Sequence, residues 1–384
     1  SVLVLLIVGA VGLVYYLGSR SLPEYTESLI VPDLTGPVDI VRDKSNVPQL
    51  FGETDEDVYY ALGYAQAQDR LLQMTKLRRT AQGRLSELFG TATVEIDTLV
   101  RRLDIYALSV ASLEAQDPKT MRILQAYATG VNARLDQVNL QALGRGAPEM
   151  FLFNAPVAPW RPADTLAIVK LMGLRLSGHL DNEVLRARMS LAVTDQDRLR
   201  DILPDAPGSG VAALPEYASL FPSVPRFADN TSGDKHPLSP FGPSIFKGAS
   251  NVWAAAPSRS ATGSTLLAND PHLGFSTPAI WYLARIELQS GGVIGGTIPG
   301  MPAILSGRSA DLGWGLASAG LDDQDVFIEE VNPDNPEEYR TPTGFKAFET
   351  RKSIINIKDE TPITITQRWT DNGPVLPGSF YDLG

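Results

Sequence analysis

The sequence lacks cysteine altogether and contains only three histidines in 384 residues. Without cysteine, disulfide bonds, a thiolate nucleophile and a cysteine-ligated metal are excluded. The absence of thiols fits an oxidising compartment. Because only His179, His236 and His272 are present, a metal centre built from several histidines is nearly excluded as well.

Basic residues are also fewer than acidic ones. The sequence has 33 lysines and arginines against 44 aspartates and glutamates, which gives a net charge of −11. This balance argues against nucleic acid or an anionic membrane surface as the main partner. The hydrophobic fraction of 43% is enough for a full core, and the length predicts two or more globular units.

Charge is absent from residues 2–18, VLVLLIVGAVGLVYYLG. The length of this run is at the lower limit of the roughly 17–25 residues that cross a bilayer, and Tyr15 and Tyr16 would lie at its interface. We expect residues 1–20 to be a signal anchor or transmembrane segment that holds the protein in the periplasm or cell envelope. A cleaved signal peptide, which would release the protein, and a buried core helix are the alternatives.

Hydrophobic periodicity divides the rest of the chain into a helical part and a strand-rich part. Thr54, followed by three acidic residues, predicts the start of a long helix that fades near Gln82-Gly83, and Asp117-Pro118 predicts the start of another. After residue 250, short segments predict strands at 251–256, 264–267, 280–288, 293–297 and 312–318. Helices followed by strands predict an α+β fold.

The two parts are separated by a segment rich in proline, glycine, serine and aspartate. We expect a mostly helical segment at 24–204, a removable linker or spacer at 205–249 and a strand-rich segment at 250–384. No terminal element is evident before Gly384, so we expect the chain to be truncated.

Ser250 stands in the stretch Gly248-Ala249-Ser250-Asn251-Val252. A serine hydroxyl is a poor nucleophile until a base takes its proton. The G-x-S-x-G elbow is disfavoured, because the second glycine is missing and a strand is predicted to follow. If the bond before Ser250 is cut instead, its new α-amine, with a pKa of about 7.7–8.0, can act as the base on the same residue. On local sequence alone, an ordinary serine at the entry to a strand is the commoner alternative.

Three segments, in this order, resemble the penicillin acylase family of N-terminal-nucleophile hydrolases: GYAQAQDRLLQMTKLRRTAQGRLSELFG, GASNVWAAAPSRSATGSTLLANDPHLGFSTPAIWYLARIEL and LGWGLASAGLDDQDVFIEE. The resemblance runs from about residue 24 to the end. It implies a four-layer αββα sandwich of stacked antiparallel sheets flanked by helices. It also implies a precursor that excises its own spacer, leaving an α chain and a β chain whose first residue, here Ser250, is catalytic.

The resemblance assigns further catalytic roles. His272, in the segment Asn269-Asp-Pro-His-Leu273, would orient or polarise the serine hydroxyl; without the resemblance it would be read as a turn residue. The segment 314–319 matches the strand that offers a backbone N–H to the oxyanion, and spacing from Ser250 selects Ala319. Such a donor is worth about 2.7–4 kcal/mol in a comparable site. The family's oxyanion asparagine lies beyond Gly384, which again implies truncation.

A calcium site is also implied by the resemblance. Asp322 and Asp325 match its carboxylates, the Gln324 carbonyl lies between them, and Glu183 would add a ligand from the α segment. Ca²⁺ takes roughly 6–8 oxygen ligands. Its role would be structural, and no organic cofactor is expected. A solvated acidic loop is the alternative.

The acyl group would lie in an apolar pocket. Met172 and Leu176, four residues apart on one helix, match pocket positions of the family, and Leu273 and Leu316 would join them; plain core packing is the alternative for each.

The implied reaction is hydrolysis of an amide in a small N-acylated molecule, through an acyl-enzyme on Ser250. Family members hydrolyse penicillins, glutaryl- or aminoadipyl-cephalosporins, or N-acyl-homoserine lactones, and His272 favours the last two kinds. The rival hypothesis is a membrane-anchored envelope protein that keeps the fold as a binding module without catalysis. The presence of Ser250, Asn251 and His272 favours the enzyme.

Overall fold

The fold is known from a computed structural model, which describes residues 2–20, 22–31, 34–140, 157–177, 189, 193, 195–202, 250–271, 273, 276–317, 327 and 329–376. The helices are α1 (Val2–Arg20), α2 (Asp55–Ala81), α3 (Ser86–Phe89), α4 (Val94–Arg102), α5 (Ile105–Ala111), α6 (Pro118–Leu140), α7 (Pro162–Ser177) and α9 (Gln196–Ile202), with 3₁₀ turns η1 (Gly90–Thr93) and η3 (Pro257–Arg259).

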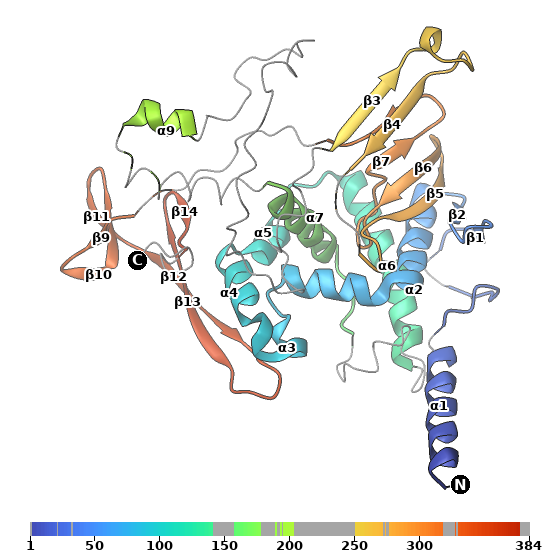
Figure 1. The fold of residues 1–384 in the computed structure, drawn as a ribbon, viewed down its shortest axis with the longest axis horizontal. Coiled ribbons are helices and arrows are strands. Elements are labelled where there is room, and N and C mark those ends of the chain that lie inside the picture. The colour runs from blue at the N-terminus through green and yellow to red at the C-terminus, as the bar shows by residue number, and fades with distance from the viewer. Residues whose placement is uncertain are drawn as a thin grey trace.

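The strands follow mainly after residue 250. They are β1 (Asp39–Arg42), β2 (Pro48–Phe51), β3 (Asn251–Ala255), β4 (Leu266–Asp270), β5 (Tyr282–Leu288), β6 (Gly291–Thr297), β7 (Ser306–Arg308), β8 (Gly313–Trp314), β9 (Val331–Asn332), β10 (Asn335–Thr341), β11 (Gly344–Ala347), β12 (Glu349–Ile355), β13 (Ile363–Thr370) and β14 (Gly373–Pro374). In Figure 1, helices occupy the centre and two groups of strands lie on opposite sides of them. The predicted α+β fold class is confirmed.

Two helix starts lie where the capping residues predicted them. In α2, the Thr54 hydroxyl accepts a hydrogen bond from the Asp57 N–H at 3.1 Å. At the start of α6, the Asp117 carboxylate accepts from the N–H groups of Lys119 and Thr120 at 2.9 and 3.1 Å. These side chains satisfy N–H groups that have no partner inside the helix.

The end of α2 also agrees with the prediction. Gly83 has φ of +60°, a left-handed conformation that glycine adopts without a Cβ clash. Its N–H donates to Thr80 O at 3.0 Å, and the next N–H, from Arg84, donates to Arg79 O at 2.9 Å. This is the Schellman pattern, which stops the helix at this glycine.

The largest sheet of the described residues joins the two parts of the chain. Its strand order is β1-β2-β5-β6-β7-β8. Strand β2 pairs in parallel with β5, with Gln49 opposite Arg285 and Leu50 opposite Ile286. The remaining pairs in this sheet are antiparallel. Residues before 203 and residues after 249 are therefore held in one backbone hydrogen-bond ladder.

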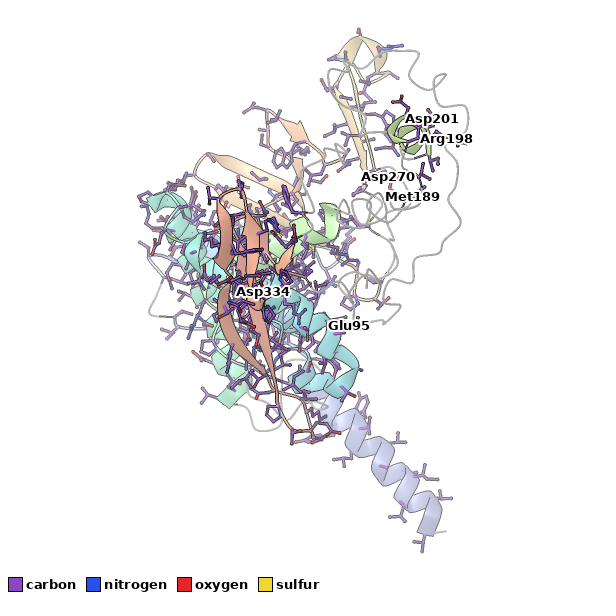
Figure 2. The ribbon with its side chains drawn as sticks, turned by 90° about the vertical axis from the view of Figure 1, so that its left-hand side faces the viewer. Glu95, Met189, Arg198, Asp201, Asp270 and Asp334 are labelled. Carbon is purple, nitrogen blue, oxygen red and sulfur yellow. The ribbon has the colours of Figure 1, made fainter. Side chains whose placement is uncertain are left out.

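Smaller sheets complete the strand-rich part: the β3–β4 hairpin, a three-stranded β11-β10-β9 sheet and a three-stranded β12-β13-β14 sheet. Figure 2 shows β12 and β13 beside α4, the helix that carries Glu95. The strand expected at 312–318 is shorter than predicted, since only Gly313–Trp314 pairs, and the strands after residue 330 were not predicted. In β12, several side chains are charged and exposed, so the hydrophobic alternation is weak.

The uncharged run at the N-terminus forms α1, which extends away from the other elements in Figures 1 and 2. Among the helices that the structure describes, none is both long and apolar enough to cross a membrane. The predicted location in the cell envelope stays a prediction.

Helices α2 and α6 pack so closely that glycine is required on both. A Cβ added at Gly130 would lie 1.9 Å from Tyr60 O, and one added at Gly63 would lie 2.2 Å from Tyr127 O. Both distances are to backbone atoms, which cannot move without shifting a helix. The crossing of these two helices therefore depends on the two missing side chains.

Gly130→Ala is expected to destabilise the protein by at least about 1–3 kcal/mol, because the added methyl group forces the helices apart. Gly173→Ala is the matched control, since a Cβ at this position in α7 meets nothing within 4 Å and alanine is favoured over glycine in a helix by about 0.5–1 kcal/mol. Urea unfolding midpoints of the two variants and the wild type measure both effects. Equal midpoints for Gly130→Ala and wild type would contradict the packing argument.

Candidate active site

Ser250 lies immediately before β3 and is half-buried. Strand β3 pairs with β4, with Asn251 opposite Asp270 and Val252 opposite Asn269. The nucleophile predicted from the sequence is therefore at the end of a two-stranded hairpin, next to the last residues of β4.

The side chain of Asn269 joins this hairpin to two other segments. Its Nδ2 donates to Asn251 O at 3.0 Å and to Leu316 O at 2.9 Å. Its Oδ1 accepts from the Leu316 N–H at 3.1 Å and from the Ser306 hydroxyl at 2.8 Å. One amide thus connects the start of β3, strand β7 and the residues that follow β8.

Gly315 permits this contact. A Cβ at Gly315 would lie 2.8 Å from both Cβ and Cγ of Asn269. The neighbouring Trp314 is held by its indole N–H, which donates to Ile304 O at 3.1 Å. The sequence Trp314-Gly315-Leu316, expected to lead to the oxyanion donor, is thereby fixed beside β4.

Not all predicted site residues can be placed relative to one another. The hydrogen bonds bring together the neighbourhoods of Ser250 and Leu316, and Leu316 is 49% exposed. On α7, Met172 lies in the hydrophobic core with 6% exposure, whereas Leu176 is 51% exposed. Leu273 is half-buried. The pocket role assigned to these leucines and Met172 stays a prediction.

The remaining predicted catalytic and metal-binding residues lie outside the described residues. They are His272, Ala319, Glu183, Asp322, Gln324 and Asp325. Within the described ranges, no group of three or more acidic or histidine side chains is arranged to hold a metal ion. The calcium site stays a prediction.

Asn269 is the residue that sequence reasoning missed. It was noted only as the first residue of the segment that contains His272. A signal was present, since asparagine is depleted in strands and here it occupies an interior position of β4. A polar residue that disfavours its own strand is a candidate for a contact made by its side chain.

The first of the three family-like segments begins in α2. Within this helix, Asp69 connects distant parts of the chain. Its carboxylate accepts two hydrogen bonds from Arg42, at 2.9 and 3.0 Å, and one from the Tyr25 hydroxyl at 2.9 Å. It also accepts from the Tyr282 hydroxyl of β5 at 2.7 Å. Burial raises the pKa of Tyr282, and the nearby charge of Asp69 raises it further.

One turn earlier in α2, Gln66 makes a second connection. Its Oε1 accepts from the Tyr127 hydroxyl of α6 and, at 2.9 Å, from the Gly300 N–H. Both side chains are fully buried, so these bonds are shielded from water. The glutamine and aspartate of the sequence Gln-Ala-Gln-Asp therefore link α2 to α6 and to the strand-rich part.

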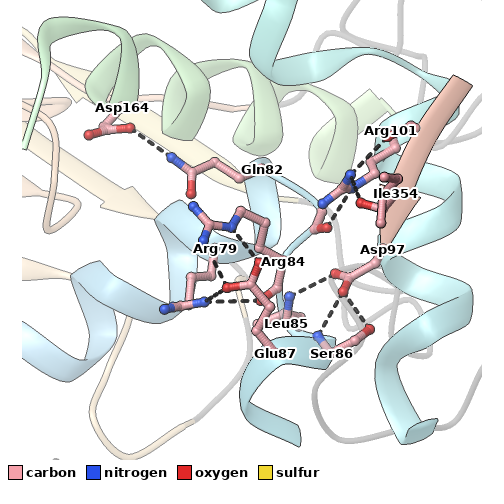
Figure 3. A network of polar contacts seen from close by, with 12 residues as sticks. Arg79, Gln82, Arg84, Leu85, Ser86, Glu87, Asp97, Arg101, Asp164 and Ile354 are labelled. Carbon is pink, nitrogen blue, oxygen red and sulfur yellow. Dashed lines mark hydrogen bonds and ion pairs between the residues drawn. The ribbon is translucent and has the colours of Figure 1, made fainter. Parts of the chain in front are cut away.

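The end of the same segment forms the polar network of Figure 3. Glu87 accepts from Arg84 at 2.7 and 2.8 Å and from Arg79 at 2.7 Å. Burial alone would raise the pKa of Glu87, but the hydrogen bonds and charges of the two arginines outweigh it, and the pKa is lowered. Glu87 therefore holds the loop after α2 against the last turn of that helix.

A buried carboxylate organises the other side of this loop. Asp97 of α4 accepts from the N–H groups of Leu85 and Ser86 at 2.8 and 2.7 Å and from the Ser86 hydroxyl at 2.5 Å. Burial raises the pKa of Asp97 despite these bonds. Arg101, one turn on, donates to Ile354 O of β12 at 2.6 Å, so the loop is also connected to the β12–β13 sheet.

With this geometry established, comparison with known proteins identifies the family. The family profile of penicillin amidases matches residues 37–383, which is nearly the whole chain. The chain belongs to the penicillin amidase family. The resemblance predicted from the three segments is confirmed.

Several named relatives in the penicillin amidase family are similar over most of this chain. The penicillin acylase 2 proenzyme of Pseudomonas sp. strain SE83 is 31% identical over 93% of the chain and 46% of its own length. The acyl-homoserine lactone acylase QuiP of Pseudomonas aeruginosa is 30% identical over 93% of the chain and 42% of its own length. The chain therefore spans under half the length of these relatives.

A solved structure of a penicillin amidase relative is also similar. The thermostable penicillin G acylase of Alcaligenes faecalis is 28% identical, with 47% of this chain and 98% of that chain covered and a TM-score of 0.39. A TM-score this low does not establish how layers stack, so the four-layer arrangement stays a prediction.

Glu87→Gln is expected to lower the free energy of unfolding at pH 7 by about 1–3 kcal/mol, because charge-assisted hydrogen bonds to two arginines are lost. The lowered pKa of Glu87 means that its contribution is fully present above the unfolded value of about 4.3. The contribution is lost as pH falls through the folded value, so the stabilities of the two proteins converge in acid.

Urea unfolding at pH 7 and in acid measures the difference. Glu114→Gln, at an exposed turn position after α5, is the control and should match the wild type at both pH values. If Glu87→Gln lowered the free energy of unfolding by the same amount at both pH values, the electrostatic origin of the effect would be contradicted.

Proposed function

We propose that this protein is a self-processing amidohydrolase, in which Ser250 becomes the N-terminal nucleophile of a β chain. The observation that carries the proposal is that the chain is a member of the penicillin amidase family with a serine at the entry to β3, half-buried and beside the segment that leads to the predicted oxyanion donor. The word proenzyme in the name of one relative agrees with processing.

The first chemical step is scission of the bond before Ser250. The Ser250 hydroxyl attacks the carbonyl of Ala249, and the acyl group passes from nitrogen to oxygen as the peptide nitrogen takes a proton. Water then hydrolyses the resulting ester. The products are the carboxylate of Ala249 and a free α-amine on Ser250, and the hydroxyl is regenerated.

The second reaction uses the new terminus. The α-amine takes the proton of the hydroxyl as its oxygen attacks the acyl carbonyl of the substrate, and the backbone N–H of Ala319 is proposed to stabilise the oxyanion. The proton then passes to the leaving amine, an ester remains on Ser250, and water releases the acid. An α-amine pKa of about 7.7–8.0 implies that the rate rises with pH through this range, because only the neutral amine is a base.

Two sets of contacts would hold the two chains together after scission. The part before residue 203 and the part after residue 249 share the ladder between β2 and β5, and side chains of α2 bind to the second part through Tyr282 and Gly300. A cut between them removes one covalent connection and leaves these contacts in place.

The proposed substrates are small molecules in which an acyl group is joined by an amide to a β-lactam nucleus or to a homoserine lactone. This choice rests on the names of relatives, which are penicillin acylases and acyl-homoserine lactone acylases. A panel of both compound types, followed by release of free amine, tests it. Turnover of neither type by a correctly cleaved protein would reject this substrate class.

Ser250→Ala is expected to leave the full-length protein as one uncut chain, because the attacking oxygen is removed, whereas the wild type yields two chains, the second beginning at Ser250. Intact mass spectrometry and end-group sequencing measure this. Ser258→Ala, in the exposed turn η3, is the matched control and should be cut like the wild type.

A wild-type protein that hydrolyses acyl amides while remaining one chain would reject the N-terminal-amine mechanism. A wild-type protein that stays uncut and inactive but binds these compounds would instead support the binding-module hypothesis. Undiminished turnover after chemical blocking of the new amine would likewise contradict the proposed base.

A structural calcium ion bound by Glu183, Asp322, Gln324 and Asp325 remains part of the proposal, on the strength of the resemblance of these positions to the family's calcium site. Millimolar Ca²⁺ is expected to raise the melting temperature of the wild type, because an ion that binds only the folded state stabilises it. The double variant Asp322→Asn with Asp325→Asn should lose this response, and Asp334→Asn, exposed in the turn between β9 and β10, should keep it. Equal Ca²⁺ responses in all three proteins would reject the site.

We also propose that the protein acts in the periplasm or cell envelope. The absence of cysteine and the uncharged run at residues 2–18 support this location. Cell fractionation with marker enzymes tests it, and recovery of the cleaved, active protein only in the cytoplasmic fraction would reject it.

A further inference from the structure

We propose that Asn269 is a positioning residue that fixes the nucleophile relative to the oxyanion segment, an inference that rests on the proposed function. The observation is that one side-chain amide hydrogen-bonds both to the residue after Ser250 and to Leu316, three positions before Ala319.

The need for such a link follows from the sheet topology. Strands β3 and β4 form a separate two-stranded sheet, while β7 and β8 belong to the six-stranded sheet. Among the described residues, no backbone ladder therefore runs from the strand of Ser250 to the segment after β8. A side-chain contact between the two segments can take over the role of setting the distance between the proposed nucleophile and the proposed oxyanion donor.

Asparagine is suited to this position because its amide has the same donor and acceptor groups as a peptide unit. Its Nδ2 and Oδ1 bind the C=O and N–H of the same residue, Leu316, at 2.9 and 3.1 Å. This two-bond exchange resembles a hydrogen-bonded pair in an antiparallel sheet. The second Nδ2 hydrogen then reaches Asn251 O, so all the strong donor positions of the amide are used.

Gly315 supports the assignment independently. A side chain at this position would collide with Cβ of Asn269 at 2.8 Å, an atom that cannot rotate away. At Gly313, in the same segment, an added Cβ meets only the end of the flexible Leu267 side chain, at 3.0 Å. The close approach is therefore specific to the residue beside Asn269.

A positioning role has a defined effect on kinetics. Asn269 does not contact the reacting atoms, so its loss should lower kcat through misplacement of Ser250 against the oxyanion donor. A misplacement of about 1 Å can cost on the order of 10²-fold in rate. Substrate binding in the acyl pocket should change little, so KM should stay within about threefold.

The test compares three variants of the full-length protein. Asn269→Ala removes all four hydrogen bonds. Asn269→Asp keeps the Oδ1 acceptor but loses both Nδ2 donations, to Asn251 O and Leu316 O. Ser306→Ala is the matched control, because it removes one bond to Asn269 and leaves the connection between the two catalytic segments.

Both Asn269 variants are expected to be cleaved more slowly at Ser250 and, once cleaved, to show kcat reduced by about 10²-fold; Ser306→Ala should stay within about threefold of wild type in both rates. Unfolding midpoints are measured alongside, and rates are compared at a temperature where all variants are folded. Wild-type kcat in folded Asn269→Ala would overturn the inference. An equal loss in Ser306→Ala, or a loss of kcat that only follows the folded fraction, would overturn it by showing a general structural role.

The failure of this inference is distinguishable from failure of the proposed function. A wild-type protein that neither cleaves itself nor hydrolyses an acyl amide would reject the function whatever the Asn269 variants do. An active wild type with an equally active Asn269→Ala would reject only the positioning role.

Discussion

The carboxylate of Asp69 is the interaction on which the connection between the two parts of the chain most depends. Arg42 and Tyr25 bind it from the N-terminal side, and Tyr282 binds it from β5. Its side chain is only 13% exposed, so the bidentate contact with Arg42 is screened less by water and salt than a surface pair would be. Through Arg42 of β1 and Tyr282 of β5, this group joins α2 to the six-stranded sheet.

This arrangement would keep the two parts of the protein together after the proposed cut before Ser250. Gln66, which accepts from the Gly300 N–H, and the β2–β5 ladder connect the same two parts of the chain at other points. Both lie in buried surroundings, where hydrogen bonds are not exchanged for water. The close crossing of α2 and α6 at Gly63 and Gly130 brings the backbones of the two helices into direct contact. A new terminus at Ser250 would then arise on a body whose remaining parts do not separate.

The segments that we propose to be catalytic are held together by a side-chain amide rather than by a strand ladder. The hairpin of β3 and β4 lacks a ladder to the six-stranded sheet within the described residues, and the Asn269 amide takes the place of that ladder. The amide can then set the proposed nucleophile against the segment that leads to the proposed oxyanion donor.

Local features were predictable from the sequence and distant ones were not. Thr54, Gly83 and Asp117 cap helices through contacts within five residues, so their pattern alone located the helix ends. The family and the α+β class followed from extended motifs and from the order of helices and strands. The strands after residue 330 were not predicted: in β12 exposed charged residues hide the alternation, whereas β13, with its sequence ITITQRWT, carried a readable strand pattern that was overlooked.

The sequence by itself therefore determined which kinds of side-chain chemistry are available, where α2 begins and ends, where α6 begins, and that the chain belongs to the penicillin amidase family. Each of these depends on residue identity or on neighbours along the chain. Only the tertiary structure decided that β2 joins β5, and that Asn269 meets Asn251 and Leu316, which are 18 and 47 positions away. Those contacts form only when tertiary packing brings segments together that lie far apart in the chain, and no local pattern encodes that proximity.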